Sequence, residues 1–180
     1  MPRLLPLVAF GALLLAACDA THMTPSTGEA GAAEAIDTVR VVIGGTTVVV
    51  TDLDAATPTL EPASVRLDTA TTFNGQIVFG EALAAEIEDE AESHLFVYST
   101  SSDAAVVTTT DRESLYAAQN LNDGDYPVGL AFTLRTPNTE GPVDLTVRLN
   151  HFDGVAKTSA TDAGSATDLT VTIPLVVSGS

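Results

Sequence analysis

Two histidines and a nearby glutamate have the clearest capacity for chemistry in this chain of 180 residues. Glu90 and His94 are four residues apart, so they would share one face of a helix that extended to His94. His151 ends a run of alternating apolar residues, which predicts a ring that points inward near the rim of a sheet. Two imidazoles and a carboxylate suit a divalent transition metal such as zinc, copper or iron. The plainer alternative is that His94 caps a helix C-terminus and His151 is an ordinary edge histidine.

A second group of candidate ligands lies in a turn-rich stretch. Residues 120–125 read Asn-Leu-Asn-Asp-Gly-Asp, and Asp52 and Asp54 offer further carboxylates. A calcium loop that began at Asn120 would have Gly124 at its fifth position and no glutamate at its twelfth, so the EF-hand spacing is not met. An ordinary β-turn explains these residues better, and no calcium ligand is assigned.

The sequence lacks several catalytic signatures. It contains no Gly-rich phosphate loop before a helix, no Gly-x-Ser-x-Gly elbow and no His-Glu-x-x-His pair. No spacing singles out a serine that would join His94 or His151 in a Ser-His-Asp site. Paired carboxylates are found by chance in so acidic a chain, so they carry no weight. We therefore expect a protein that is not an enzyme, with an extracellular hydrolase as the weaker alternative.

Hydrophobic patterning predicts the elements that would position these residues. Two Val- and Thr-rich runs, 38–43 and 46–51, flank Gly44-Gly45 and predict a β-hairpin. Strict alternation predicts three half-buried strands within 128–134, 143–149 and 169–177. Pro174 has no N–H, so we expect the last strand to lie at an edge or to bulge there. Shorter β-favouring runs predict further strands at 65–68, 73–79, 94–99 and 104–109.

One helix is predicted, over residues 81–93. Leu83, Ile87 and Ala91 are spaced by four and share one face, while acidic residues occupy the others. Many short strands with one short acidic helix predict an all-β fold, an antiparallel Ig-like β-sandwich of about eight strands. A barrel is the alternative. No β-α-β alternation supports a parallel nucleotide-binding sheet.

The charge balance restricts the partners. Seven basic and 24 acidic residues give a formal net charge of −17, and Lys157 is the single lysine. Such a chain is unsuited to nucleic acid, because phosphate binding needs clustered lysine and arginine. It is also unsuited to lying flat on an anionic bilayer. A solvated acidic surface, as in proteins of salt-loving organisms, is favoured over a specific attraction for cations or a basic partner.

Leu15-Ala16-Ala17-Cys18 resembles the lipobox of bacterial lipoproteins. The tetrapeptide closes an apolar run from residue 4 to residue 17, which is shorter than the roughly 20 residues of a membrane-spanning helix. The resemblance implies a signal peptide over 1–17 and a Cys18 that carries palmitate-type acyl chains. Residues 18–37 would form a flexible tether and 38–180 the sandwich. An ordinary secretory signal with an accidental cysteine is the alternative.

In residues 86–98 an acidic helix precedes a histidine and an aromatic strand, and a second set of stretches comprises 127–130, 145–151 and the closing Thr- and Val-rich strand. These stretches are similar to uncharacterised envelope lipoproteins of Bacteroidota-type bacteria. The resemblance implies a lipid-anchored binding or accessory module of the cell envelope, associated with outer-membrane uptake machinery through a protein partner. It would be anchored to the inner or outer membrane and face the periplasm or the exterior. The alternative is a transition-metal-binding lipoprotein that uses His94 and His151.

Overall fold

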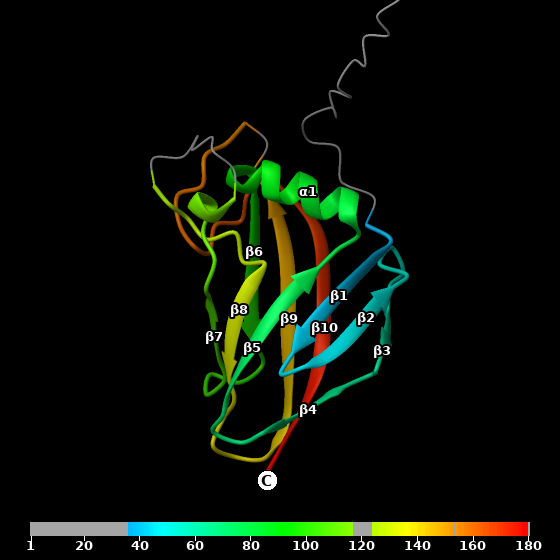
Figure 1. Cartoon of the computed structure of the whole chain (residues 1–180). Coiled ribbons are helices and arrows are strands. Elements are labelled where there is room, and N and C mark those ends of the chain that lie inside the picture. The colour runs from blue at the N-terminus through cyan, green and yellow to red at the C-terminus, as the bar shows by residue number, and fades with distance from the viewer. Residues whose placement is uncertain (1–35, 117–123, 153, 180) are drawn as a thin grey trace, which may run out of the picture.

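The computed structural model describes residues 36–116, 124–152 and 154–179. Two β-sheets face each other, and helix α1 (Glu81–Asp89) lies across one end of the sandwich (Figure 1). The expected all-β sandwich with one short helix is confirmed, although the described residues form ten strands instead of about eight. Among the described residues, no helix is both long and apolar enough to cross a membrane.

The larger sheet has six strands in the order β3-β2-β1-β5-β8-β7, and every pairing in it is antiparallel. Its strands are β1 (Thr38–Ile43), β2 (Thr46–Thr51), β3 (Thr59–Glu61), β5 (Thr72–Val78), β7 (Val106–Thr109) and β8 (Ala131–Arg135). The short strand β3 lies in a stretch whose prolines and acidic residues predict a loop.

The smaller sheet has four strands in the order β4-β10-β9-β6. They are β4 (Val65–Asp68), β6 (His94–Thr100), β9 (Gly141–His151) and β10 (Ala166–Ser178). β10 pairs antiparallel with β9 and parallel with β4, so it lies inside the sheet.

The expectation that Pro174 marks an edge strand or a bulge at that residue is wrong. The register of β10 shifts at a different place, between Thr167 and Leu169. β4 pairs with β10 only from Leu175 onward, so no β4 residue lies opposite Pro174. An interior strand tolerates this proline because only one neighbour runs beside it there.

The hairpin predicted at Gly44-Gly45 is confirmed. Ile43 pairs with Thr46, which leaves a turn of two residues between β1 and β2. The two glycines have φ of +57° and +86°, and a type I′ turn requires positive φ at both positions.

The helix is shorter than the sequence predicts. It ends at Asp89 and is followed by a 3-10 turn (Ala91–Ser93), after which His94 begins β6. Ile87 and Ala91 are fully buried, as their spacing predicts. The chain leaves the α-helical path because β6 pairs with β9 from its first residue onward, and this pairing needs extended backbone.

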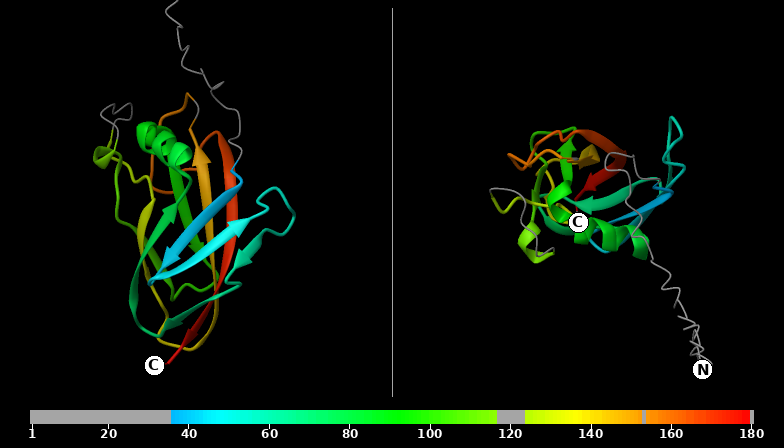
Figure 2. Two further views of the ribbon diagram at one scale, coloured as in Figure 1. Left: turned by 45° about the vertical axis from the view of Figure 1, so that its right-hand side comes forward. Right: turned by 90° about the horizontal axis from the view of Figure 1, so that it is seen from above.

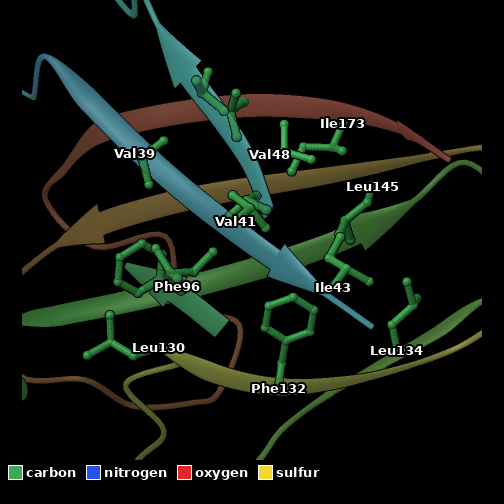
Figure 3. Packing of buried hydrophobic residues seen from close by; sticks show 14 of the residues in the cluster. Val39, Val41, Ile43, Val48, Phe96, Leu130, Phe132, Leu134, Leu145 and Ile173 are labelled. Carbon is green, nitrogen blue, oxygen red and sulfur yellow. The ribbon is translucent and has the colours of Figure 1, made fainter. Parts of the chain in front are cut away.

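Apolar side chains from both sheets fill the interior. Val41 and Phe132 from the larger sheet point toward Phe96 and Leu145 from the smaller one (Figure 3). The two further views show the sheets facing each other and α1 across one end of the sandwich (Figure 2). The polar residues described next gather at that end, where β6 starts and β9 stops.

Candidate functional site

The two predicted histidines lie together. His94 and His151 are directly opposite each other in β6 and β9, so their side chains leave the same face of the sheet. Their rings stack with centroids 4.7 Å apart and planes inclined by 28°. His94 is fully buried, with its Nδ1 at 3.0 Å from the main-chain oxygen of Glu90. The His151 side chain is 12% exposed, so the inward orientation expected for it is confirmed.

Glu90 does not complete a metal site. The helix stops before His94, and the contact between the two residues uses the Glu90 carbonyl instead of its carboxylate. The lone pair of an imidazole nitrogen lies in the ring plane, so stacked rings do not direct two lone pairs at one ion. Within the described ranges, no group of three or more His, Cys, Asp or Glu side chains is placed to hold a metal. The geometry therefore argues against the predicted site of Glu90, His94 and His151.

Asp168 also belongs to this group, although the sequence pattern does not predict it. It is the extra residue where the register of β10 shifts, and its side chain is completely buried. One carboxylate oxygen lies 3.4 Å from Nδ1 of His151. Strict alternation would place Asp168 outward with Thr170, but a bulge changes the direction of the residue that it inserts. The carboxylate beside the imidazole pair is thus supplied by β10 and not by the helix.

A second polar group surrounds Lys157. Its side chain is fully buried in the connection between β9 and β10. Nζ lies 2.9 Å from Oε1 of Glu113, 2.6 Å from the carbonyl oxygen of Ala91 and 3.3 Å from that of Pro127. Burial lowers the pKa of Lys157, and the hydrogen bond and charge of Glu113 oppose this shift. Three segments that are distant in sequence therefore meet at one amine.

Asp111 organises the third polar group. Its carboxylate accepts a hydrogen bond of 2.9 Å from the Gly129 N–H and one of 2.8 Å from the Tyr116 hydroxyl. The Tyr98 hydroxyl donates to the Gly129 carbonyl. Burial raises the pKa of Tyr98 and of Tyr116, and the charge of Asp111 adds to both shifts. These bonds hold the segment before β8 against β6.

The calcium hypothesis receives no support from the part of the chain that is described. The Asp52 carboxylate accepts a hydrogen bond of 2.8 Å from the Thr59 hydroxyl. Asp125 accepts bonds of 3.0 Å from both the amide and the hydroxyl of Ser114. Both carboxylates thus accept hydrogen bonds from residues seven and eleven positions away in sequence. Residues 117–123, which hold most of the suspected loop, lie outside the described residues, as do Cys18 and the signal segment.

No protein-family model matches the chain, and no curated protein sequence does either. One solved structure with a resemblance is described as SSP-19, an MSP-domain protein like family member in Caenorhabditis elegans. The identity is 19%, the match covers 66% of this chain and 96% of that one, and the TM-score is 0.35. A likeness at this level bears on neither activity nor partners.

The described surface includes three hollows, and among the polar side chains described above Tyr98 lines one of them and Asp52 another. One, of 230 Å³, lies between β6 and β7 beside Tyr98 and Val107. The other two, of 340 and 500 Å³, border Ile36 and the neighbouring residues of α1 or of the turn after β2. His94, His151 and Lys157 contribute to none of these three. The polar neighbours of His151 and Lys157 are instead the buried carboxylates of Asp168 and Glu113.

Proposed function

We propose that the protein is a binding or accessory module without catalytic activity, held at the cell envelope by a lipid on Cys18. The observation that carries the proposal is the interior pairing of the ionisable side chains at the α1 end. His151 faces Asp168 and Lys157 faces Glu113, and none of these four side chains lines the three hollows described above. An enzyme instead needs its acids, bases or nucleophiles to converge on a pocket.

The anchor follows from the motif that ends at Cys18. Seventeen residues, 19–35, separate this cysteine from the first described residue, Ile36. A chain of that length reaches at most about 60 Å when fully extended, which is enough to hold a small domain clear of a bilayer. Two acyl chains are sufficient for stable anchoring, because each buried methylene contributes about 0.8 kcal/mol.

The partner that we propose is a protein of the envelope. The acidic balance of 24 acidic residues against 7 basic ones disfavours nucleic acid and the anionic bilayer surface as ligands. Association with outer-membrane uptake machinery rests on the resemblance of residues 86–98 and 145–151 to envelope lipoproteins. The anchor would lie in the inner or the outer membrane.

The first prediction tests the anchor. Full-length protein, extracted from the membranes of its own bacterium with detergent, should have an intact mass that begins at Cys18 and includes acyl chains. Cys18→Ser should abolish acylation and leave residues 1–17 attached, because lipidation precedes cleavage in this class of protein. A matched control, Thr24→Ser in the proposed tether, should be processed as wild type. A mature chain that starts elsewhere and carries an unmodified thiol would contradict the proposal.

A further inference from the structure

Lys157 and Glu113 join the two sheets at the α1 end. Lys157 lies in the connection between β9 and β10 of the smaller sheet. Glu113 begins a 3-10 turn (Glu113–Leu115) in the connection between β7 and β8 of the larger sheet. Their side chains are 0% and 5% exposed, and the nitrogen and oxygen are 2.9 Å apart. The single lysine of the whole sequence is therefore held, without access to water, against a carboxyl group of the opposite sheet.

The other contacts of Nζ show how a neutral amine would be oriented. The carbonyl oxygens of Ala91 and Pro127 lie within hydrogen-bond distance, and a carbonyl can only accept. A neutral amine has two N–H bonds and one lone pair. When the two carbonyls take the two N–H bonds, the lone pair is left for a third neighbour, and the carboxyl group of Glu113 is in contact with the nitrogen, 2.9 Å from Nζ to Oε1. Contact between a nitrogen and a carboxyl group is the first requirement for attack on the carboxyl carbon.

We propose that Lys157 and Glu113 condense to an intramolecular amide that links the two sheets. A proton first passes from the ammonium to the carboxylate, which gives an amine and a carboxylic acid. The nitrogen then attacks Cδ of Glu113, so that a C–N bond forms. A C–O bond breaks, and the hydroxyl leaves with the proton from nitrogen as one water molecule. The products are a Lys157–Glu113 amide and water, and no oxidant, reductant or further reactant takes part.

Burial favours both stages of this reaction. Removing a charged pair from water is costly. Burial lowers the pKa of Lys157, and the charges of Glu113, Glu92 and Asp111 oppose this shift. Groups held at contact distance react as if at effective concentrations of about 10⁵ M or more, which offsets the tendency of an amide to hydrolyse in water. The buried position then keeps water away from the finished bond.

The second prediction concerns the tryptic peptides of folded, full-length protein. Trypsin cuts after arginine and lysine, and the cuts after Arg112, Arg135 and Arg148 release residues 113–135 and 149–180. With the amide in place, Lys157 is not cut, and mass spectrometry should find 113–135 joined to 149–180 with the mass of one water missing. If only separate peptides 113–135, 149–157 and 158–180 are found, the contact is an ion pair and the proposal is overturned.

Three variants check that the link is specific. Lys157→Arg keeps the positive charge but cannot form this amide, and Glu113→Ala removes the acyl group, so both should lose the joined peptide completely. Glu90→Gln alters an exposed carboxyl group at the same end of the molecule and should keep it. If either of the first two variants fails to fold, the wild-type chain still decides the question. After unfolding in denaturant, an amine-reactive reagent should not label Lys157 in wild type, and full labelling would refute the amide.

Discussion

At the scale of single residues, the Tyr98 hydroxyl is a contact that depends on its proton. It donates to the Gly129 carbonyl, and a phenolate would have no hydrogen to donate. Burial raises the pKa of Tyr98 well above its ordinary value of 10.0, with a further contribution from the charge of Asp111. The folded protein therefore keeps this contact between β6 and the segment before β8 above pH 10. Its contribution to stability is fully present below pH 10 and falls as the pH rises from 10 toward the raised pKa.

The third prediction follows from the sign of this shift. Above pH 10 the unfolded chain releases the Tyr98 proton while the folded protein retains it, so stability falls as pH rises, by about 1.4 kcal/mol for each pH unit. Denaturant unfolding at about pH 9 and about pH 11 should show a loss that is smaller by about 1 kcal/mol in Tyr98→Phe than in wild type. Tyr116, whose charge also raises the pKa of Tyr98, is present in both proteins. Equal losses would show that Tyr98 titrates normally.

Residue-level features differed in how far the sequence could predict them. The inward orientation of His151 followed from its parity with Val147 and Leu149, because alternation along a regular strand is a local property. The burial of Asp168 depends on a shift in the β9–β10 register, and the alternation of residues along β10 does not predict that shift. The partners of Lys157 come from segments 30 to 66 positions away, so its being the single lysine was the one available signal.

At the scale of elements, Gly129 lets the chain cross closely over β6 before β8 begins. Its φ is +89°, and a Cβ added there would lie 2.7 Å from the Phe96 carbonyl oxygen and 2.8 Å from the Phe96 Cβ. Gly45 in the β1–β2 hairpin has nearly the same φ, +86°, but a Cβ there would meet nothing within 4 Å. The two glycines therefore share the backbone requirement and differ in the space around them.

The fourth prediction uses this matched pair. Gly45→Ala should cost about 1–2 kcal/mol, which is the usual penalty for a side chain at positive φ. Gly129→Ala should cost about 1–3 kcal/mol more, because backbone and side chain of Phe96 must move apart as well. Denaturant midpoints of the two variants measure the difference. Similar losses of stability in both variants would mean that Phe96 moves aside at little cost and that the close approach of Gly129 to β6 is not required.

Elements were predictable where the pattern was local. The hairpin and the alternating strands follow from composition and period, and the apolar spacing gave the buried face of α1. The end of α1 is determined by a tertiary contact and not by the local sequence, because the pairing of His94 with His151 requires extended backbone. The parallel pairing of β4 with β10 was equally hidden, since alternation shows which side of a strand is buried and not which strand lies beside it.

At the scale of the whole molecule, the surface charge opposes compactness. Residues 18–180 carry 24 acidic and 6 basic residues, which is 24 − 6 = 18 net negative charges. The basic contribution to the surface is smaller still, because Lys157 is fully buried. Like charges that are close together in the folded state repel one another, and unfolding separates them.

The fifth prediction is that salt raises the melting temperature. Counterions shorten the reach of charge repulsion to about 8 Å at physiological ionic strength and to about 3 Å at 1 M. Thermal unfolding followed by circular dichroism should therefore shift upward between low and molar sodium chloride. Sodium sulfate gives a comparison in which exclusion from the surface adds to screening. A flat or falling melting temperature in sodium chloride would favour a specific cationic partner for the acidic surface.

The position of β10 bears on how the chain acquires its shape as it is made. β10 is the last strand described, yet it lies inside its sheet, between β9 and the far earlier β4. A polypeptide that emerges from the ribosome, or passes through an export channel, delivers Val65 long before Leu175, its partner in the ladder. β6 and β9 can pair before β10 is made, but β4 gains its ladder partner in this sheet only when β10 arrives, so the sheet is completed late. For the exported protein that we propose, this last pairing would form after the chain has crossed the membrane.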